Sequence, residues 1–585
     1  MTRPVSEGQL GAKVPDSLYR IDWQPAAGVR LVKSLEGWAV LGSDDLGLGV
    51  PAHTEPVAAD VLVLPVVSAE GDVPTRVHET VQATLKQLQA WLDGPSDGKL
   101  LVVTRGAVAG DPDLAQAPVW GLVRAAQAEN PGRVQVVDVD DLPQSLRALP
   151  AVVASGEPEA IVRVGEVRVP RLAKVTTVGD PLDWAVDGTV LVTGGAGLLG
   201  GHLARHLVAR GARKLVLTSR RGLAAPGARE LVEELGAGVT VAACDVTDRA
   251  DLARLIESLP DLTAVVHAAG QMDSAVLTAL TPEQVANVLR PKVDAAWHLH
   301  ELTASRDLKA FVLYSSAGGL LLAAGQANYA AGNVFLDALA GHRAALGLPA
   351  TSLAWGPWEG SGDAVDLTHV ARYGVAELAV TDGLDLFDAA LAAGEPTLVP
   401  VQLADLREAD RIAPLLRGLV TATPRRAAAA AGPVTAAPEA GFADKLTGMS
   451  ADERETAVLQ LVCDNAAAVL GYDDASAVGV EKGFTDLGID SLAALELRNR
   501  LGAACGLRLP ATLIFDYPSP LPLTRFLLGE LLPELGEPAE GALSRESAVV
   551  GGGATGSDEV AAIAGMDLAD LVRSAMAGTE TEESQ

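Results

Sequence analysis

Apolar runs typical of β-strands alternate with segments of helical periodicity through the first 420 residues of this 585-residue chain. The first series of runs comprises VLVLPVV (61–67), KLLVVT (99–104) and RVQVVDV (133–139), with the helical pattern ETVQATLKQLQAWL (79–92) between them. A second series comprises TVLVT (189–193), LVLTS (215–219), VTVAACD (239–245), AVVHAAG (264–270) and FVLYSS (311–316). Because parallel strands need crossover helices, this alternation predicts an α/β fold with two tandem Rossmann-like units that meet near 175–188.

Segments rich in Ala, Gly, Pro, Glu or Ser divide the rest of the chain and predict linkers at 421–449 and 534–557. Between them, two helical patterns with apolar spacing of three and four predict a small helical domain. We therefore expect a cofactor-free subdomain, a nucleotide-binding subdomain, a small four-helix domain and a short C-terminal segment, at 15–180, 181–420, 450–533 and 558–585.

Charge and cysteine content exclude several classes of protein. The net charge of −30 is unsuited to wrapping a nucleic acid, because such proteins neutralise phosphates with Lys and Arg. Cys244, Cys463 and Cys505 are far apart and lack the spacing of zinc sites or disulfide frameworks. His202 and His206 lie four apart on a predicted helix without a third ligand nearby in sequence, so we expect no metal site. Without a signal pattern or a long apolar run, we expect a cytoplasmic protein with no membrane contact.

A glycine-rich turn separates the first strand of the second unit from an amphipathic helix, in VLVTGGAGLLGGHLARHL. Glycines there permit a tight turn and let phosphate oxygens approach main-chain N–H groups at the helix N-terminus. The predicted dinucleotide contacts in this turn are Thr193, Gly194, Gly195, Gly197, Leu198 and Gly200. The first unit has no such turn, so we expect it to hold no nucleotide.

The end of the next strand distinguishes two dinucleotides. An enzyme that uses NAD usually carries an acidic residue there, whereas this chain has Ser219 and Arg220, followed by Arg221. A guanidinium suits a 2′-phosphate, so the pattern favours NADPH. The ends of later strands supply further predicted cofactor contacts, namely Asp245, Val246, His267, Ala268, Ala269 and Gly270.

Four side chains further along the chain fit a proton-delivery site. Tyr329 and Asn333 lie four apart on a predicted helix and so face one groove, Ser316 ends an apolar strand, and Lys292 lies on an earlier helix. Hydride addition to a ketone creates an alkoxide that needs a proton donor, and a nearby ammonium makes a phenol, with its ordinary pKa of about 10, a stronger acid. A serine hydroxyl can hydrogen-bond the carbonyl oxygen and orient it.

In order, TGGAGLLG, HAAG, Lys292, Ser316, Tyr329, Asn333 and LAWGPW (353–358) resemble the ketoreductase domain of modular type I polyketide synthases, a branch of the short-chain dehydrogenase/reductases. The resemblance covers roughly 15–420, because the family also has a cofactor-free first half that the segment beginning DSLYRIDW matches. It implies that Tyr329 donates the proton and that Ser316 polarises the ketone. It also implies that Lys292 and Asn333, exchanged in this branch relative to the wider superfamily, tune and relay protons.

The stereochemical fingerprint of that family fits this chain incompletely. One product type usually carries Leu-Asp-Asp after HAAG, where this chain has Met272, Asp273 and Ser274. The other usually carries a tryptophan eight residues before the tyrosine, where Leu321 stands. Asp273 favours the first type, and the configuration of the product stays open.

The small domain carries a serine where a helix begins. Alone, Ser491 is explained as an N-cap whose hydroxyl bonds backbone N–H groups. However, Gly488-Ile489-Asp490-Ser491-Leu492, followed by LRNRL and ATLIFDYPSP, resembles the acyl carrier protein domains of the same synthases. This resemblance implies 4′-phosphopantetheine on Ser491, attached by a phosphopantetheinyl transferase.

The resemblance also implies partners. The substrate is expected to be a carrier-tethered β-ketoacyl polyketide intermediate, reduced with NADPH to a β-hydroxyacyl thioester during chain extension. The implied partners are an upstream ketosynthase and acyltransferase, and a downstream synthase polypeptide or thioesterase. The segment DEVAAIAGMDLADLVRSAM (558–576), with a partly apolar helical face, resembles the docking tails of such polypeptides.

Two other functions stay open at this stage. The reductase block can be a silent or epimerising scaffold beside a working carrier domain, or the chain can be a free-standing reductase of small ketones. NADPH oxidation with a β-keto thioester would distinguish the first alternative, and equal efficiency on untethered substrate would support the second.

Overall fold

The computed structural model describes residues 16–420 and 442–532, with gaps at 28–33, 95–96, 141, 186, 322–323, 362–369, 372, 405, 407–411, 473, 490 and 511. Most of the first predicted linker, the linker predicted over 534–557 and the docking segment predicted over 558–585 lie outside the described residues. Within the described residues, no helix combines the length and apolarity needed to cross a bilayer.

The first α/β unit alternates strands with helices as predicted. Its elements are β1 (Leu18–Pro25), β2 (Trp38–Leu41), β3 (Ala52–His53), β4 (Val61–Pro65), α1 (Val73–Asp93), β5 (Lys99–Arg105), α2 (Ala117–Glu129), β6 (Val134–Val139), α3 (Pro143–Leu146), α4 (Leu149–Ser155), β7 (Glu159–Arg163) and β8 (Glu166–Lys174). Alternate residues of β4 and β5 face opposite layers, with Leu62 packed in the cluster of α1 and α2, and Val63 in that of α4. Because both sheet faces are covered, these strands read as continuous apolar runs.

The second α/β unit repeats the alternation. It begins with β9 (Thr189–Thr193), α5 (Leu198–Ala209), β10 (Lys214–Ser219), α6 (Ala228–Leu235), β11 (Val239–Ala243), α7 (Arg249–Glu257) and β12 (Leu262–His267). It continues with η3 (Leu277–Ala279), α8 (Pro282–Leu289), η4 (Arg290–Asp294), α9 (Ala295–Thr303), β13 (Ala310–Ser316), α10 (Gly318–Leu321), α11 (Ala327–Ala345), β14 (Thr351–Trp355), α13 (Val380–Ala393) and β16 (Thr397–Pro400).

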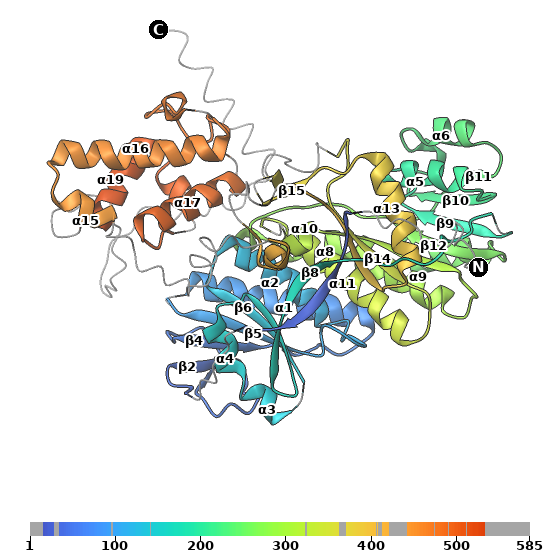
Figure 1. Cartoon of the computed structure of the whole chain (residues 1–585), viewed down its shortest axis with the longest axis horizontal. Coiled ribbons are helices and arrows are strands. Elements are labelled where there is room, and N and C mark those ends of the chain that lie inside the picture. The colour runs from blue at the N-terminus through green and yellow to red at the C-terminus, as the bar shows by residue number, and fades with distance from the viewer. Residues whose placement is uncertain are drawn as a thin grey trace, which may run out of the picture. The chain divides into compact units, whose positions relative to one another are not determined.

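One continuous sheet joins the two units (Figure 1). Its strand order is β11-β10-β9-β12-β13-β14-β16-β1-β8-β7-β6-β5-β4-β2-β3. The N-terminal strand β1 lies between the units and pairs antiparallel with both β16 and β8. The chain leaves β9 for β10 on one side and returns to β12 on the other, so the strand order reverses at β9. In open α/β sheets, ligands bind outside the carboxyl ends of the strands at such a switch point.

Helices α2 and α11 connect the two units on one face of this sheet. A Cβ atom on Gly121 of α2 would lie 2.3 Å from the carbonyl carbon of Ala330 in α11, so only glycine allows the helices to approach this closely. The helix that carries Tyr329 therefore packs directly against the first unit.

The C-terminal domain is a helical bundle, drawn in orange and red in Figure 1. It comprises α15 (Phe442–Thr447), α16 (Ala451–Leu470), η6 (Ala475–Ala477), α17 (Ser491–Cys505), α18 (Leu513–Asp516) and α19 (Pro520–Leu531). Its core includes Val462, Leu497 and Leu527, all fully buried. Leu446 of α15 is buried in the same cluster, so the bundle includes residues that were predicted to belong to the linker over 421–449. Apolar Phe442 and Leu446 anchor this short helix despite the alanine-rich stretch before it.

Candidate active site

The glycine turn after β9 has the backbone that a dinucleotide requires. Gly194 adopts a φ of +69°, and a Cβ atom there would lie 2.8 Å from the Ala269 nitrogen. Gly200 faces back onto the turn, where a Cβ atom would lie 2.5 Å from the Gly194 carbonyl oxygen. Gly197 is the N-cap of α5 and supplies no side chain to bond the first N–H groups of the helix. These N–H groups and the positive end of the helix dipole are therefore available to an anion.

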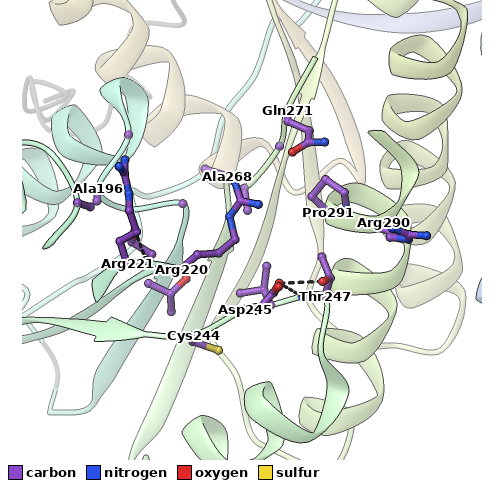
Figure 2. Close-up of a pocket in the computed structure, with 18 of the residues that line it drawn as sticks. Ala196, Arg220, Arg221, Cys244, Asp245, Thr247, Ala268, Gln271, Arg290 and Pro291 are labelled. Atoms are coloured by element: carbon purple, nitrogen blue, oxygen red, sulfur yellow. Dashed lines mark hydrogen bonds between the residues drawn. The ribbon is translucent and has the colours of Figure 1, made fainter. Parts of the chain in front are cut away.

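A cavity of about 510 Å³ opens beside this turn. Figure 2 shows Arg220 and Arg221 on the side of the glycine turn, with Arg290 and Pro291 across from them. Asp245 forms the floor between them, held by Thr247, whose Oγ1 donates to Asp245 Oδ1 at 2.7 Å. The cavity thus combines a helix N-terminus, three guanidinium groups and one carboxylate.

The structure brings most of the predicted cofactor contacts to this cavity. Those that line it are Gly194, Gly197, Ser219, Arg220, Asp245, Val246, Ala268, Ala269 and Gly270. Gly195 and Gly200 instead allow tight packing behind the turn, and Leu198 is half exposed on α5. Thr193 and His267 are fully buried, with 2.7 Å between Thr193 Oγ1 and His267 Nδ1. Burial, aided by the nearby Lys292 ammonium, lowers the pKa of His267 to about 3, so this ring is a neutral bridge between β9 and β12.

Sequence reasoning missed several cavity residues that come from one region. Gln271, Asn287, Arg290 and Pro291 line the cavity although none belongs to the glycine turn or its flanking strands. Arg290 begins η4, a π-helical turn between α8 and α9, and Lys292 lies in the same turn. The sequence did contain a signal for Arg290. It stands two residues before the predicted catalytic Lys292, so its side chain can face the cofactor side of the same groove.

Three of the predicted catalytic side chains meet in a second cavity of about 330 Å³. Ser316 reaches it from the end of β13, Tyr329 from the first turns of α11, and Lys292 from η4. The two cavities share Ala268, Gly270 and Gln271 as lining residues, so they form one continuous cleft. The convergence that the proton-delivery hypothesis requires is present in the structure.

Lys292 lies against Tyr329 in a buried position. Its Nζ is 4.9 Å from the centre of the Tyr329 ring and donates a hydrogen bond to the Tyr314 carbonyl oxygen at 3.3 Å. Only 3% of Lys292 is exposed, and burial lowers its pKa, since the ammonium loses its hydration. Tyr314 also lines the cavity, but burial raises the pKa of its phenol, which disfavours it as a proton donor.

The hydroxyl of Ser316 is oriented by its own turn. The Gly318 N–H donates to Ser316 Oγ at 3.1 Å, which leaves the hydroxyl hydrogen free to be donated into the cavity. Asn328 positions the neighbouring tyrosine, because its Oδ1 accepts from the Tyr329 N–H at 2.9 Å. Ser315 Oγ donates to the Asn333 carbonyl oxygen at 3.2 Å and so ties β13 to α11.

Asn333 does not line the cavity. Its side chain is buried, one helical turn after Tyr329 in α11, and within the described part of the chain neither its Oδ1 nor its Nδ2 has a hydrogen-bond partner. A buried amide without partners is costly. The predicted common groove of Tyr329 and Asn333 is therefore not reflected in the lining of this cavity.

The residues of the stereochemical fingerprint lie on two sides of the cavity. Met272 and Leu321 both line it. Asp273 directs its carboxylate to α8 instead, where it accepts from Gln284 Nε2 at 2.9 Å and from Asn287 Nδ2 at 3.2 Å. The Asp273 carboxylate, on which the prediction of the first product type rests, is thus part of a structural hydrogen-bond network.

The remaining sites involve histidines and the carrier serine. His206 Nε2 lies 3.1 Å from Asp388 Oδ2, and among the described residues no group of three His, Cys, Asp or Glu side chains could hold a metal ion. Ser491 is the first residue of α17, as predicted for the attachment site at a helix start.

Comparisons with known proteins agree with this geometry. Three family models match the chain: a ketoreductase domain at residues 188–360, the Rossmann fold domain of polyketide synthase extender module SpnB at 21–172, and a phosphopantetheine attachment site at 460–527. The last match contains Ser491. The models thus cover the glycine turn, most of the first α/β unit and most of the helical bundle.

Individual relatives are polyketide synthases. The chain is 44% identical to polyketide synthase GfsE of Streptomyces halstedii over 97% of its own length, and 43% identical over 88% to the spectinabilin synthase protein NorA of Streptomyces orinoci. It spans 14% and 29% of the lengths of these two proteins. A solved A-type ketoreductase from a modular polyketide synthase is 33% identical, with a TM-score of 0.63 over 69% of this chain and 97% of that one. The chain therefore belongs to the modular polyketide synthases, of which it carries a ketoreductase domain, an oxidoreductase, followed by a phosphopantetheine-attachment domain.

Proposed function

We propose that the chain uses NADPH to reduce a β-ketoacyl thioester, tethered to phosphopantetheine on Ser491, to a β-hydroxyacyl thioester during polyketide chain extension. The observation that carries the proposal is the single cleft in which Ser316, Tyr329 and Lys292 meet beside the glycine turn.

The cavity at the glycine turn fits NADPH. The backbone of Gly194 leaves no room for a Cβ atom, and the uncapped N-terminus of α5 suits a pyrophosphate. Arg220 and Arg221 offer charge-assisted hydrogen bonds to a 2′-phosphate. When bound there, NADPH supplies a hydride for the ketone carbon.

The residues of the second cavity supply the proton. Ser316 donates a hydrogen bond to the ketone oxygen and orients it. Tyr329 then transfers its phenolic proton to that oxygen as negative charge develops, which completes the hydroxyl group. The buried Lys292 ammonium, 4.9 Å from the ring, stabilises the resulting phenolate. Solvent then supplies the proton that restores the phenol of Tyr329, and Lys292 and Asn333 relay it.

The carrier domain raises the effective concentration of the substrate. A thioester on a long flexible arm reaches the cleft without free diffusion, so binding becomes effectively intramolecular. This role requires a phosphopantetheinyl transferase to modify Ser491. It also implies exchange with an upstream ketosynthase and acyltransferase, and with a downstream synthase polypeptide or thioesterase.

Intact-protein mass spectrometry tests the proposal directly. The chain is converted to its phosphopantetheine form, loaded with a β-ketoacyl group and incubated with or without NADPH. We expect the acyl group to gain two hydrogens only with NADPH, and expect Ser491→Ala to accept no load. Loading without any gain of hydrogens would overturn the reductase function and favour a silent scaffold beside a working carrier.

A further inference from the structure

One carboxylate of the first α/β unit bonds the backbone of the second unit. Glu129 is the last residue of α2, and its two oxygens accept hydrogen bonds from two backbone N–H groups of the second unit. Oε2 accepts from Leu277 at 2.9 Å, and Oε1 accepts from Gly325 at 3.0 Å. Both bonds are buried, so water does not compete with them.

The two segments held by Glu129 each contribute to the wall of the substrate cavity. Leu277 follows the segment that contributes Gln271 and Met272 to the cavity, and Gly325 lies between the lining residues Ala324 and Gln326. These segments also meet each other, since Ala275 and Gln326 form an isolated β-bridge. Met272 and Leu321, which stand at the two positions by which the family distinguishes its product configurations, line the same cavity.

The same segments position the proton donor. Gln326 is the N-cap of α11, three residues before Tyr329. Asn328 Nδ2 donates to the Asp273 carbonyl oxygen at 2.9 Å and to the Gln284 carbonyl oxygen at 3.0 Å. A displacement of either segment would therefore move Tyr329 relative to the cavity wall that carries Met272.

A carboxylate is well suited to this position and is costly to place there. It can accept two separate N–H bonds at once, whereas an amide offers a single acceptor oxygen. Burial raises the pKa of Glu129 to about 7, and the N–H groups of Gly325 and Leu277 oppose that shift. An apolar contact would join the two units without the cost of burying a carboxylate.

We propose that Glu129 is a positioning residue that fixes the Leu277 and Gly325 segments of the cavity wall relative to Tyr329, and thereby governs which face of the ketone receives the hydride. This inference rests on the proposed reductase function and adds to it a specificity determinant outside the catalytic unit. It assigns to the cofactor-free unit a part in product configuration.

The test measures the ratio of product diastereomers from an untethered α-methyl-β-keto thioester, together with kcat, KM and the melting temperature. The Glu129→Gln variant loses one of the two bonds, because its amide NH2 group then faces a backbone N–H and two donors meet. We expect it to lower the ratio of major to minor product by about tenfold. Glu129→Asp keeps the charge but is too short to reach both N–H groups, so it should lower the ratio as well. It provides the measurement if the Gln variant does not fold.

Gln127→Leu is the matched control. Gln127 lies in α2, two residues before Glu129, and donates to the carbonyl oxygen of Pro158 at 2.7 Å, so its bond stays within the first unit. We expect this control to lower the melting temperature while it keeps the product ratio. An unchanged ratio in both Glu129 variants, in a chain whose wild type reduces the substrate, would overturn the positioning role alone. An inactive wild type would overturn the proposed function, and with it this role.

Discussion

The two α/β units share one sheet, yet their first helices begin in opposite ways. Helix α1 of the first unit is capped by Asp72, whose Oδ1 accepts from the Thr75 N–H at 3.0 Å. Helix α5 of the second unit is capped by Gly197, which offers no side chain. The backbone angles of the two caps are similar, with φ and ψ of −70° and 166° for Asp72 and −82° and 175° for Gly197. In α1, a carboxylate satisfies a backbone N–H group at the start of the helix. In α5, no side chain does so, which leaves the first N–H groups open to an anion.

The comparison teaches that function here depends on the loops at the strand ends and not on the sheet itself. Both units present the carboxyl ends of parallel strands, but among the described residues the glycine turn and the helix that carries Tyr329 lie at that edge of the second unit. The first unit retains a different task, because its helix α2 packs on α11.

The largest expected effect concerns Tyr329, the proposed proton donor, which lies in the second unit. Tyr329→Phe removes the phenolic proton and should lower kcat by about 10² to 10⁴, measured as NADPH oxidation with a β-keto thioester. Tyr314→Phe keeps the backbone carbonyl that binds Lys292, and should retain most of the activity. Equal losses in both variants would contradict the assignment of Tyr329.

The second prediction concerns a substitution that gives α5 the kind of N-cap that α1 has. Gly197→Asp introduces a carboxylate at a backbone already suited to an N-cap, where it should bond the helix N–H groups and repel the pyrophosphate. We expect the Kd for NADPH to rise about 100-fold, by fluorescence titration, while the melting temperature is kept or raised. Gly197→Ala adds the Cβ atom without the charge and should have a smaller effect. Unchanged affinity in the Asp variant would show that the helix start does not hold the phosphates.

A third prediction concerns the choice of dinucleotide. Arg220→Ala and Arg221→Ala each remove a guanidinium from the cavity and should reduce the preference for NADPH over NADH by about tenfold. The measurement is kcat/KM with both dinucleotides. Arg205→Ala, on the surface of α5 where Arg205 pairs with Glu234, is the control and should leave the preference unchanged. A parallel loss with both dinucleotides would assign these arginines to another part of the cofactor.

The smallest effect is expected in the first unit. Asp72→Ala removes the cap of α1 and should lower the free energy of unfolding by about 1 kcal/mol, measured by urea titration, without altering NADPH affinity. Hydrogen bonds from Thr75 lower the pKa of Asp72, so the stabilisation is present above the unfolded-state pKa and is lost as pH falls through the folded value. The difference between wild type and variant should therefore shrink as the pH falls below the ordinary aspartate pKa of about 3.9. A difference that grows in acid would contradict the capping role.

Local patterns predicted the strands and the glycine turn, because each depends on neighbours within a few residues. The two-unit α/β fold and the helical bundle are confirmed. Asn333 was placed on the correct helix, but spacing could not show that its amide is buried without partners and does not line the cavity. Asp273 was noticed for its identity, whereas its bonds to Gln284 and Asn287 depend on the packing of α8.

By itself, the sequence determined which residue types stand where strands end and helices begin, and these types restrict the chemistry to nucleotide binding and proton transfer. Only the tertiary structure decided that β1 joins both units in one sheet, that Arg290 faces the cofactor cavity, and that Glu129 bonds Leu277 and Gly325. The physical reason is distance along the chain. Contacts between residues 148 and 196 positions apart arise from the packing of whole elements, and no local periodicity records them.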